Sequence, residues 1–213
     1  MVFKDRKEAG SLVAEKLMHY ADREEVIVLA LPRGGVVNGF EIARRLNCPL
    51  DILIVRKIGF PGQPELAIGA VAETGAVVLN EEIISMGRIS DEYINQETEK
   101  QKEEIMRRRE LYRGGKGLPA LEGKTVILVD DGVATGATMK AAISALTQEK
   151  LKKLVVGLPV ASIEASESIG VMVDEMVCLQ SPPGFMAVGG YYEDFTQVTD
   201  EEVVDMLKRS SND

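Results

Sequence analysis

The chain has 213 residues, of which 45% are hydrophobic and 28% are charged, as is ordinary for a single soluble globular domain with a full core. Its formal net charge of −9 argues against the basic surface that nucleic-acid-binding proteins and proteins of anionic membrane surfaces use. No stretch approaches the roughly 18 apolar residues of a membrane span, and Cys48 and Cys178 are too few and too far apart for a disulfide framework. We therefore expect a cytoplasmic protein that binds neither nucleic acid nor membranes.

The first 55 residues alternate between helical and extended patterns. Apolar residues recur close to the helical period in residues 8–20, and residues 26–31 (VIVLAL) form the continuous apolar run of a buried strand. Residues 36–46 predict a second helix and residues 51–55 a second strand. A strand, a helix and a strand within about 30 residues form a βαβ unit, which is expected to have a right-handed crossover.

Residues 59–123 break this alternation and predict an insertion. Two short β-like runs, 66–71 and 76–79, flank Glu73-Thr74-Gly75 and predict a hairpin. We expect Glu73, at its tip, to be solvated, although a role as an acid or base is an alternative. A long charged helix is predicted over residues 90–112 with Ser90 as its N-cap, and its arginines 107–109 follow glutamates at the spacing of solvated ion pairs.

The second half of the chain returns to the alternating pattern. Apolar runs at 124–129, 154–158 and 173–179 predict three more strands, with a helix over 139–148. The whole pattern predicts an α/β fold in one domain, with a mainly parallel sheet of about five strands flanked by helices. The hairpin and long helix are inserted into this domain, and residues 180–195, rich in proline, glycine and aromatic residues, form a small C-terminal hood.

The most informative segment is residues 126–138, VILVDDGVATGAT. A buried strand ends at the acidic pair, Asp130 and Asp131, and small and hydroxyl residues then lead into a helix. Such a loop lies at the carboxyl edge of a parallel sheet, and backbone N–H groups at a helix start suit a phosphate. Adjacent carboxylates would repel a phosphate, so we assign them to sugar hydroxyls or to Mg²⁺. Together these groups predict a site for a phosphorylated sugar, with a candidate phosphate loop made of Val133, Ala134, Thr135, Gly136, Ala137 and Thr138.

Other motifs fit this segment less well. A Walker A loop requires a lysine directly after Gly136, which this chain lacks. A receiver domain also places an acidic pair after an apolar strand, but it does so near the start of its chain. An ordinary strand followed by a polar turn is the remaining structural alternative.

The segment resembles the ribose-phosphate motif of the type I phosphoribosyltransferases, in which an acidic pair precedes a loop similar to ATGGT. The resemblance implies that the acidic pair contacts the ribose hydroxyls of phosphoribosyl pyrophosphate, alone or with Mg²⁺, and that the loop holds its 5′-phosphate. Ala134 stands where hypoxanthine-type relatives carry an aspartate, which disfavours hypoxanthine and guanine. The PRGG loop (residues 32–35), the stretch VRKIGFPGQPELAIGA and the ending YYEDF are similar to a bacterial and archaeal branch of the family, whose acceptor the resemblance does not supply.

The loop after the first strand is the candidate site for the pyrophosphate leaving group. Glycines allow close approach of the backbone to an anion, and arginine offers a forked, permanently charged donor. In the resembled family this loop binds pyrophosphate, often through a cis peptide bond. We expect the next strand to end at the same sheet edge and to add cationic charge. The predicted pyrophosphate-binding residues are Arg33, Gly34, Gly35, Arg56 and Lys57.

The resemblance also implies a base-recognition loop within residues 180–195. Phe185 is the candidate for stacking on a nucleobase, with backbone groups near Val188 as hydrogen-bonding partners. The predicted activity is transfer of ribose 5-phosphate from phosphoribosyl pyrophosphate to a nitrogen acceptor, a purine base, by a homo-oligomer that uses Mg²⁺. Two alternatives remain open: a sensor of phosphoribosyl ligands without turnover, and a sugar-phosphate hydrolase.

Overall fold

The computed structural model describes residues 1–210, except for the side chain of Glu65, and its centre is a five-stranded parallel sheet in the order β2-β1-β6-β7-β8. The apolar runs of the sequence form these strands because parallel strands are covered on both faces. The prediction of five parallel strands is confirmed. Their bounds are β1 (Val26–Ala30), β2 (Leu50–Ile52), β6 (Thr125–Val129), β7 (Lys153–Val160) and β8 (Glu175–Gln180).

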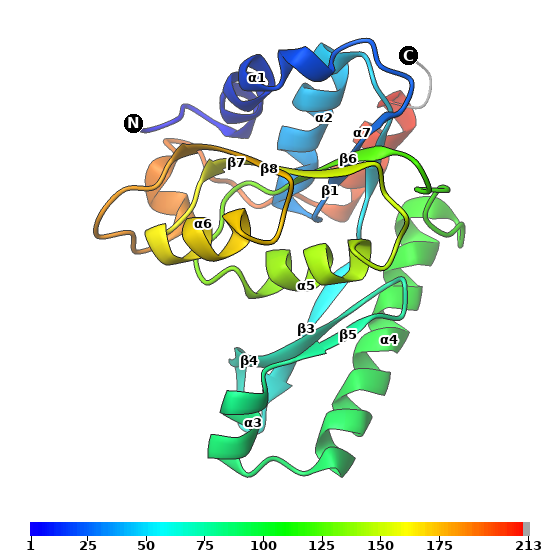
Figure 1. The fold of residues 1–213 in the computed structure, drawn as a ribbon, viewed down its shortest axis with the longest axis vertical. Coiled ribbons are helices and arrows are strands. Elements are labelled where there is room, and N and C mark those ends of the chain that lie inside the picture. The colour runs from blue at the N-terminus through cyan, green and yellow to red at the C-terminus, as the bar shows by residue number, and fades with distance from the viewer. Residues whose placement is uncertain (211–213) are drawn as a thin grey trace.

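Helices cover both faces of the sheet, as Figure 1 shows. Helices α1 (Arg6–Lys16), α2 (Gly34–Leu46) and α7 (Asp200–Ser210) lie on one face, and α5 (Ala137–Leu146) and α6 (Ile163–Gly170) lie on the other. Each face buries its own apolar core. Two 3₁₀ turns, Met18–Tyr20 and Val188–Tyr191, complete this part of the chain. The predicted first helix is therefore split, because α1 ends at Lys16.

The pairing of β1 with β6 places the candidate site. Ala30 pairs with Val129 at the ends of the two strands, and the N–H of Leu31 donates to the carbonyl of Val129 at 2.9 Å. The loops that follow these strands therefore leave the sheet side by side at its carboxyl edge, where open α/β sheets bind ligands.

The inserted segment forms a second lobe, below the main sheet in Figure 1. It contains an antiparallel sheet, β3 (Val55–Phe60), β4 (Gln63–Ala72) and β5 (Val77–Leu79), with the helices α3 (Glu81–Gly87) and α4 (Asp91–Arg113). The predicted hairpin is confirmed as β4 and β5. The N-cap prediction is also confirmed, because the Ser90 hydroxyl accepts a hydrogen bond from the N–H of Tyr93 at 3.3 Å.

The prediction of a strand over residues 51–55 is wrong about where the strand ends. β2 stops at Ile52, and the chain crosses through two buried residues into β3 of the second sheet. Arg56 and Lys57 therefore do not end a strand of the parallel sheet; they lie inside β3, paired with Val71 and Ala70 of β4. The apolar run is continuous through Leu53 and Ile54, so the sequence carries no mark of the break.

Glu73 is not solvated, contrary to the sequence-based expectation. Its side chain is 2% exposed, pairs with the guanidinium of Arg113 and accepts a hydrogen bond from the N–H of Ile54 at 2.8 Å. Burial raises the pKa of Glu73. The end of α4 packs over the hairpin turn and buries both partners, and this long-range contact is invisible in the local sequence.

The charged side chains of α4 only partly follow the prediction. Glu104 pairs with both Arg107 and Arg108, and the side chain of Arg107 is 59% exposed, as expected for a solvated face. Arg108 is instead only 23% exposed, and Arg109 donates to the carbonyl of Gly115 at 2.9 Å. Among residues 1–210, no helix is long and apolar enough to cross a membrane.

Candidate active site

The PRGG loop and the acidic pair are in direct contact. The peptide bond between Pro32 and Arg33 is cis, and α2 begins at the next residue. A Cβ atom added to Gly34 would lie 1.9 Å from Oδ2 of Asp131, and one added to Gly35 would lie 2.9 Å from the Cα and Oδ1 atoms of Asp130. Both glycines are thus required by the close approach of the two loops, rather than by a left-handed backbone.

The two carboxylates of the acidic pair are partly buried and lie beside each other. Oδ1 of Asp130 accepts a hydrogen bond from the N–H of Asp131 at 2.8 Å, and Oδ2 of Asp131 accepts one from Nε of Arg6 at 2.7 Å. Burial and the neighbouring carboxylate of Asp131 raise the pKa of Asp130 well above its usual range. Burial also raises the pKa of Asp131, although the guanidinium of Arg6 opposes this shift. Both carboxylates are therefore poorly solvated. A hydroxyl group or a cation that binds to either of them would stabilise its charged form.

Arg6 ties the acidic pair to the C-terminal segment. Its side chain is 10% exposed, it donates to the carbonyl of Thr196 at 2.8 Å, and its guanidinium lies 3.8 Å from the ring centroid of Phe195. The hydroxyl of Tyr192 also donates to the carbonyl of Asp131 at 2.5 Å. Arg6 could not be predicted from the sequence, because nothing in its local pattern indicates a partner 125 residues away.

Ser162 holds the candidate phosphate loop through two hydrogen bonds. The Ser162 hydroxyl donates to the carbonyl of Ala134 at 2.7 Å, and its backbone N–H donates to the carbonyl of Val133 at 2.9 Å. Gly136 is the N-cap of α5 and adopts a left-handed φ of 79°, which favours glycine at this position. Ala134 and Thr135 are exposed just before the start of α5, where N–H groups of a helix are unpaired. The prediction for Val133 is wrong, because Val133 is buried and its N–H donates to the carbonyl of Val160 at 3.0 Å. The loop thus combines exposed residues, a left-handed glycine and a helix start, and helix starts of this kind are known to suit anions.

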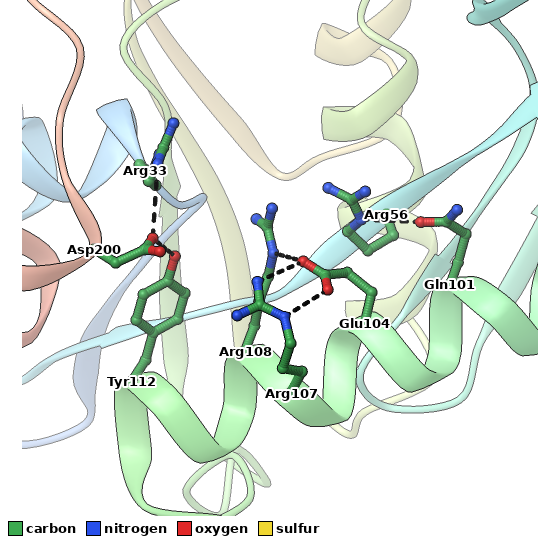
Figure 2. A network of polar contacts seen from close by, with 8 residues as sticks. All are labelled: Arg33, Arg56, Gln101, Glu104, Arg107, Arg108, Tyr112 and Asp200. Atoms are coloured by element: carbon green, nitrogen blue, oxygen red, sulfur yellow. Dashed lines mark hydrogen bonds and ion pairs between the residues drawn. The ribbon is translucent and has the colours of Figure 1, made fainter.

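Arg33 and Arg56 come from different lobes but both lie along α4 (Figure 2). Nη1 of Arg33 is 3.8 Å from a carboxylate oxygen of Asp200, and Nε of Arg56 donates to the side-chain carbonyl of Gln101 at 3.0 Å. Because side chains alternate along a strand, Lys57 projects to the opposite face of β3 from Arg56. The structure thus brings Arg33 and Arg56 to one side of α4 and directs Lys57 away.

The two candidate base-binding residues lie beside the phosphate loop. Phe185 stacks on Tyr191 with ring centroids 5.3 Å apart, and it lines a cavity of about 540 Å³ together with Ala134 and Thr135. The side chain of Val188 packs against Gly132, where an added Cβ would lie 2.5 Å from Cγ1. The hood predicted from the sequence therefore does border the site.

The contact between the two loops predicts the effect of one added methyl group. Gly34→Ala should destabilise the fold by about 1–3 kcal/mol, because the methyl group overlaps the Asp131 carboxylate and must displace it from Arg6. Gly117→Ala is the matched control, since no heavy atom lies within 4 Å of its added Cβ. Urea unfolding of both variants measures the difference, and equal midpoints would show that the loops separate freely.

The fold and the site together define a class: an α/β domain with an acidic pair, a glycine-rich loop and a loop of small residues that opens a helix, all at the carboxyl edge of a parallel sheet. Residues 4–181 match the family model described as a phosphoribosyl transferase domain, so the chain belongs to the phosphoribosyltransferase family.

Relatives support this assignment. The chain is 41% identical over 212 residues to a protein of Mycobacterium tuberculosis described as "Putative phosphoribosyl transferase"; the match covers 100% of this chain and 48% of that protein. It therefore spans about half the length of the curated relatives it matches. The crystal structure of a Thermus thermophilus protein, TT1426, superimposes with a TM-score of 0.84 and 47% identity, covering 98% of this chain and 99% of that one. A purine phosphoribosyltransferase from Pyrococcus horikoshii shares the fold, with a TM-score of 0.50, 17% identity, and coverage of 91% and 92% of the two chains.

Proposed function

We propose that the protein transfers ribose 5-phosphate from phosphoribosyl pyrophosphate to a ring nitrogen of a purine-like base and releases pyrophosphate. The main support for this proposal is the direct contact between the PRGG loop and the acidic pair. The acidic pair is followed in the chain by the candidate phosphate loop, so all three lie at the same edge of the sheet. Three binding elements for the three parts of the substrate are thereby adjacent: a loop for the leaving group, carboxylates for the ribose and an anion cradle for the 5′-phosphate.

Each element has a separate task in this proposal. Backbone N–H groups of residues 134–138 hold the 5′-phosphate at the start of α5. Asp130 and Asp131 accept hydrogen bonds from the ribose hydroxyls and place negative charge near C1 of the ribose, which becomes cationic as the leaving group departs. Arg33 and the adjacent backbone of the PRGG loop stabilise the departing diphosphate. No covalent nucleophile is required, so the protein acts by positioning the reactants, stabilising charge and excluding water.

The residues of the site fit Mg²⁺ only as a partner of the substrate. Among residues 1–210 no group of three or more histidine, cysteine, aspartate or glutamate side chains forms a cage for a metal ion. Mg²⁺ commonly binds through one or two carboxylates together with substrate phosphates and water. Asp130 and Asp131 would hold it in that way. When bound, Mg²⁺ would neutralise charge on the diphosphate.

In this proposal the C-terminal hood, residues 180–195, binds the acceptor. Phe185 borders the cavity beside the phosphate loop, and stacking of its ring on a planar base suits an aromatic acceptor. Val188 covers Gly132 next to the acidic pair, so its backbone groups are candidates for recognition of the base edge. Ala134 at the first loop position favours an adenine-like base over hypoxanthine or guanine, because it offers no carboxylate to the base.

The test is release of pyrophosphate from phosphoribosyl pyrophosphate and Mg²⁺ in the presence of a panel of purine and pyrimidine bases. Release that depends on one base supports the proposal. Release without any base identifies a sugar-phosphate hydrolase, and binding of phosphoribosyl pyrophosphate without release identifies a sensor.

Arg33 provides a prediction that concerns the leaving group alone. Arg33→Ala should weaken the binding of phosphoribosyl pyrophosphate by about ten- to a hundredfold, as expected for the loss of one charge-assisted hydrogen bond. Binding of ribose 5-phosphate, which has no diphosphate, should change little. Arg44→Ala is the control, because Arg44 lies on the helix that follows Arg33 and pairs with Glu41. Equal weakening of both ligands by Arg33→Ala would place Arg33 outside the diphosphate site.

A further inference from the structure

Three arginines from three different parts of the chain lie in a row along one side of α4 (the arginine row). Arg33 precedes α2, Arg56 belongs to β3 and Arg108 belongs to α4 itself, and Figure 2 shows all three along the same stretch of this helix. The row begins at Asp200 and Tyr112, near Arg33, and ends at Gln101, near Arg56.

The terminal nitrogens of these arginines make few hydrogen bonds within the protein. Within residues 1–210, the side chain of Arg108 donates only through Nε to Glu104, at 2.8 Å, and that of Arg56 only through Nε to Gln101, at 3.0 Å. The side chain of Arg33 makes no hydrogen bond among the same residues and approaches Asp200 only to 3.8 Å. The side chains of Arg33 and Arg108 are 34% and 23% exposed, so their guanidinium groups are partly removed from water. Partly desolvated guanidinium groups with free N–H donors favour an anionic ligand.

The charges along the row do not balance. Arg107 adds a fourth guanidinium through its pair with Glu104, whereas the neighbouring carboxylates that pair with the row are Glu104 and Asp200. A further glutamate of α4, Glu97, pairs with Lys100 and accepts from Gln101. Burial and the charge of Arg108 lower the pKa of Arg56, as expected when like charges are held together. A bound polyanion would relieve this repulsion.

The length of the row indicates what kind of anion it accommodates. At a rise of about 1.5 Å per residue, Gln101 and Tyr112 lie about 16 Å apart along the axis of α4. A diphosphate has only two phosphorus atoms joined through one oxygen, so it covers only part of this length. A linear chain of three or more phosphates extends further along the row than a diphosphate, so it can contact Arg108 in addition to Arg33, and longer chains reach further toward Arg56.

We infer that Arg33, Arg108 and Arg56 form a binding site for a linear chain of three or more phosphates, either free or carried by a nucleoside. The site does not require the proposed transfer reaction. Because it shares Arg33 with the proposed diphosphate region, its ligand should compete with phosphoribosyl pyrophosphate. The arginine of α4, Arg108, distinguishes it from that region.

Calorimetric titration of the full chain in Mg²⁺-free buffer tests this site with diphosphate, tripolyphosphate and adenosine triphosphate. The wild type should bind tripolyphosphate about tenfold or more tightly than diphosphate. Arg108→Gln should remove most of this difference, as expected for the loss of a charge-assisted contact, and should leave diphosphate binding nearly unchanged. Glutamine can still donate to Glu104, which helps to preserve the local fold.

Lys102→Gln removes the same charge from the same helix and is the matched control, since Lys102 pairs with Glu99 away from the row. The site is supported if Arg108→Gln weakens the binding of tripolyphosphate or of adenosine triphosphate and Lys102→Gln does not. The ligand that binds more tightly then shows whether the site prefers a free phosphate chain or one carried by a nucleoside. Equal affinity of the wild type for diphosphate and tripolyphosphate, or an equal loss in both variants, would overturn it. Ribose 5-phosphate binding is measured in parallel, because its failure would count against the proposed transferase site and not against the arginine row.

Discussion

Replacing both Asp130 and Asp131 with asparagine is expected to lower turnover by roughly a hundredfold or more, which is the scale of losing preorganised charge at a reacting centre. Asparagine nearly preserves the shape of each side chain but removes the negative charge. In the proposed reaction this charge matters most when C1 of the ribose becomes cationic. The kcat should therefore fall by a larger factor than the affinity for phosphoribosyl pyrophosphate.

The comparison needs a control for global charge and for folding. Asp91→Asn combined with Glu92→Gln removes two adjacent carboxylates from the exposed first turn of α4, and this variant should retain the wild-type kcat. Circular dichroism of the active-site variant checks the fold, because the Asp131 change also alters the partner of Arg6. A double variant that turns over at the wild-type rate would show that the acidic pair is structural and that the proposed mechanism is wrong.

Arg113→Met is expected to destabilise the protein by about 3–5 kcal/mol, the cost of removing one partner from a buried ion pair. The side chains of Arg113 and Glu73 are 7% and 2% exposed, so the substitution leaves a carboxylate without a counterion inside the protein. Burial already raises the pKa of Glu73, so this carboxylate takes up a proton more readily than a solvated one. The destabilisation should consequently shrink as the pH falls and Glu73 becomes neutral.

Urea unfolding at several pH values measures this effect. Adding Glu73→Gln to Arg113→Met should recover part of the lost stability, because the most buried carboxylate is then neutral. The recovery is only partial because Asp51, 3.7 Å from Arg113 in the wild type, still lacks its partner. Arg107→Met is the matched control on α4: its side chain is 59% exposed, and loss of such a surface pair costs only about 0–1 kcal/mol. Similar losses in Arg113→Met and Arg107→Met would show that the pair with Glu73 does not hold the hairpin against α4.

The main sheet could be predicted because its strands are short, continuous apolar runs separated by helical patterns. The same criterion failed at residues 51–55, where the apolar run continues while the backbone passes from one sheet to another. It also said little about α3, α6 and α7, which are short or lie near the end of the chain. Apolar periodicity reports burial, and burial alone does not identify the sheet to which a strand belongs.

The arrangement of the candidate site could be predicted where it is continuous in sequence. The acidic pair, the candidate phosphate loop and the PRGG loop each occupy one short segment, and the topology of a parallel sheet brings these segments together. Arg6 and the Glu73–Arg113 pair join residues far apart in the chain, so no local pattern reveals them. The reason for Gly34 also emerges only in three dimensions, as space needed by the Asp131 carboxylate.

The most direct test of the central claim is a crystal structure of the protein with ribose 5-phosphate. We expect the phosphate to lie within hydrogen-bonding distance of the backbone N–H groups of residues 134–138, with the ribose hydroxyls directed at Asp130 and Asp131. A phosphate bound consistently elsewhere, with the loop at the start of α5 closed against its neighbours, would contradict it.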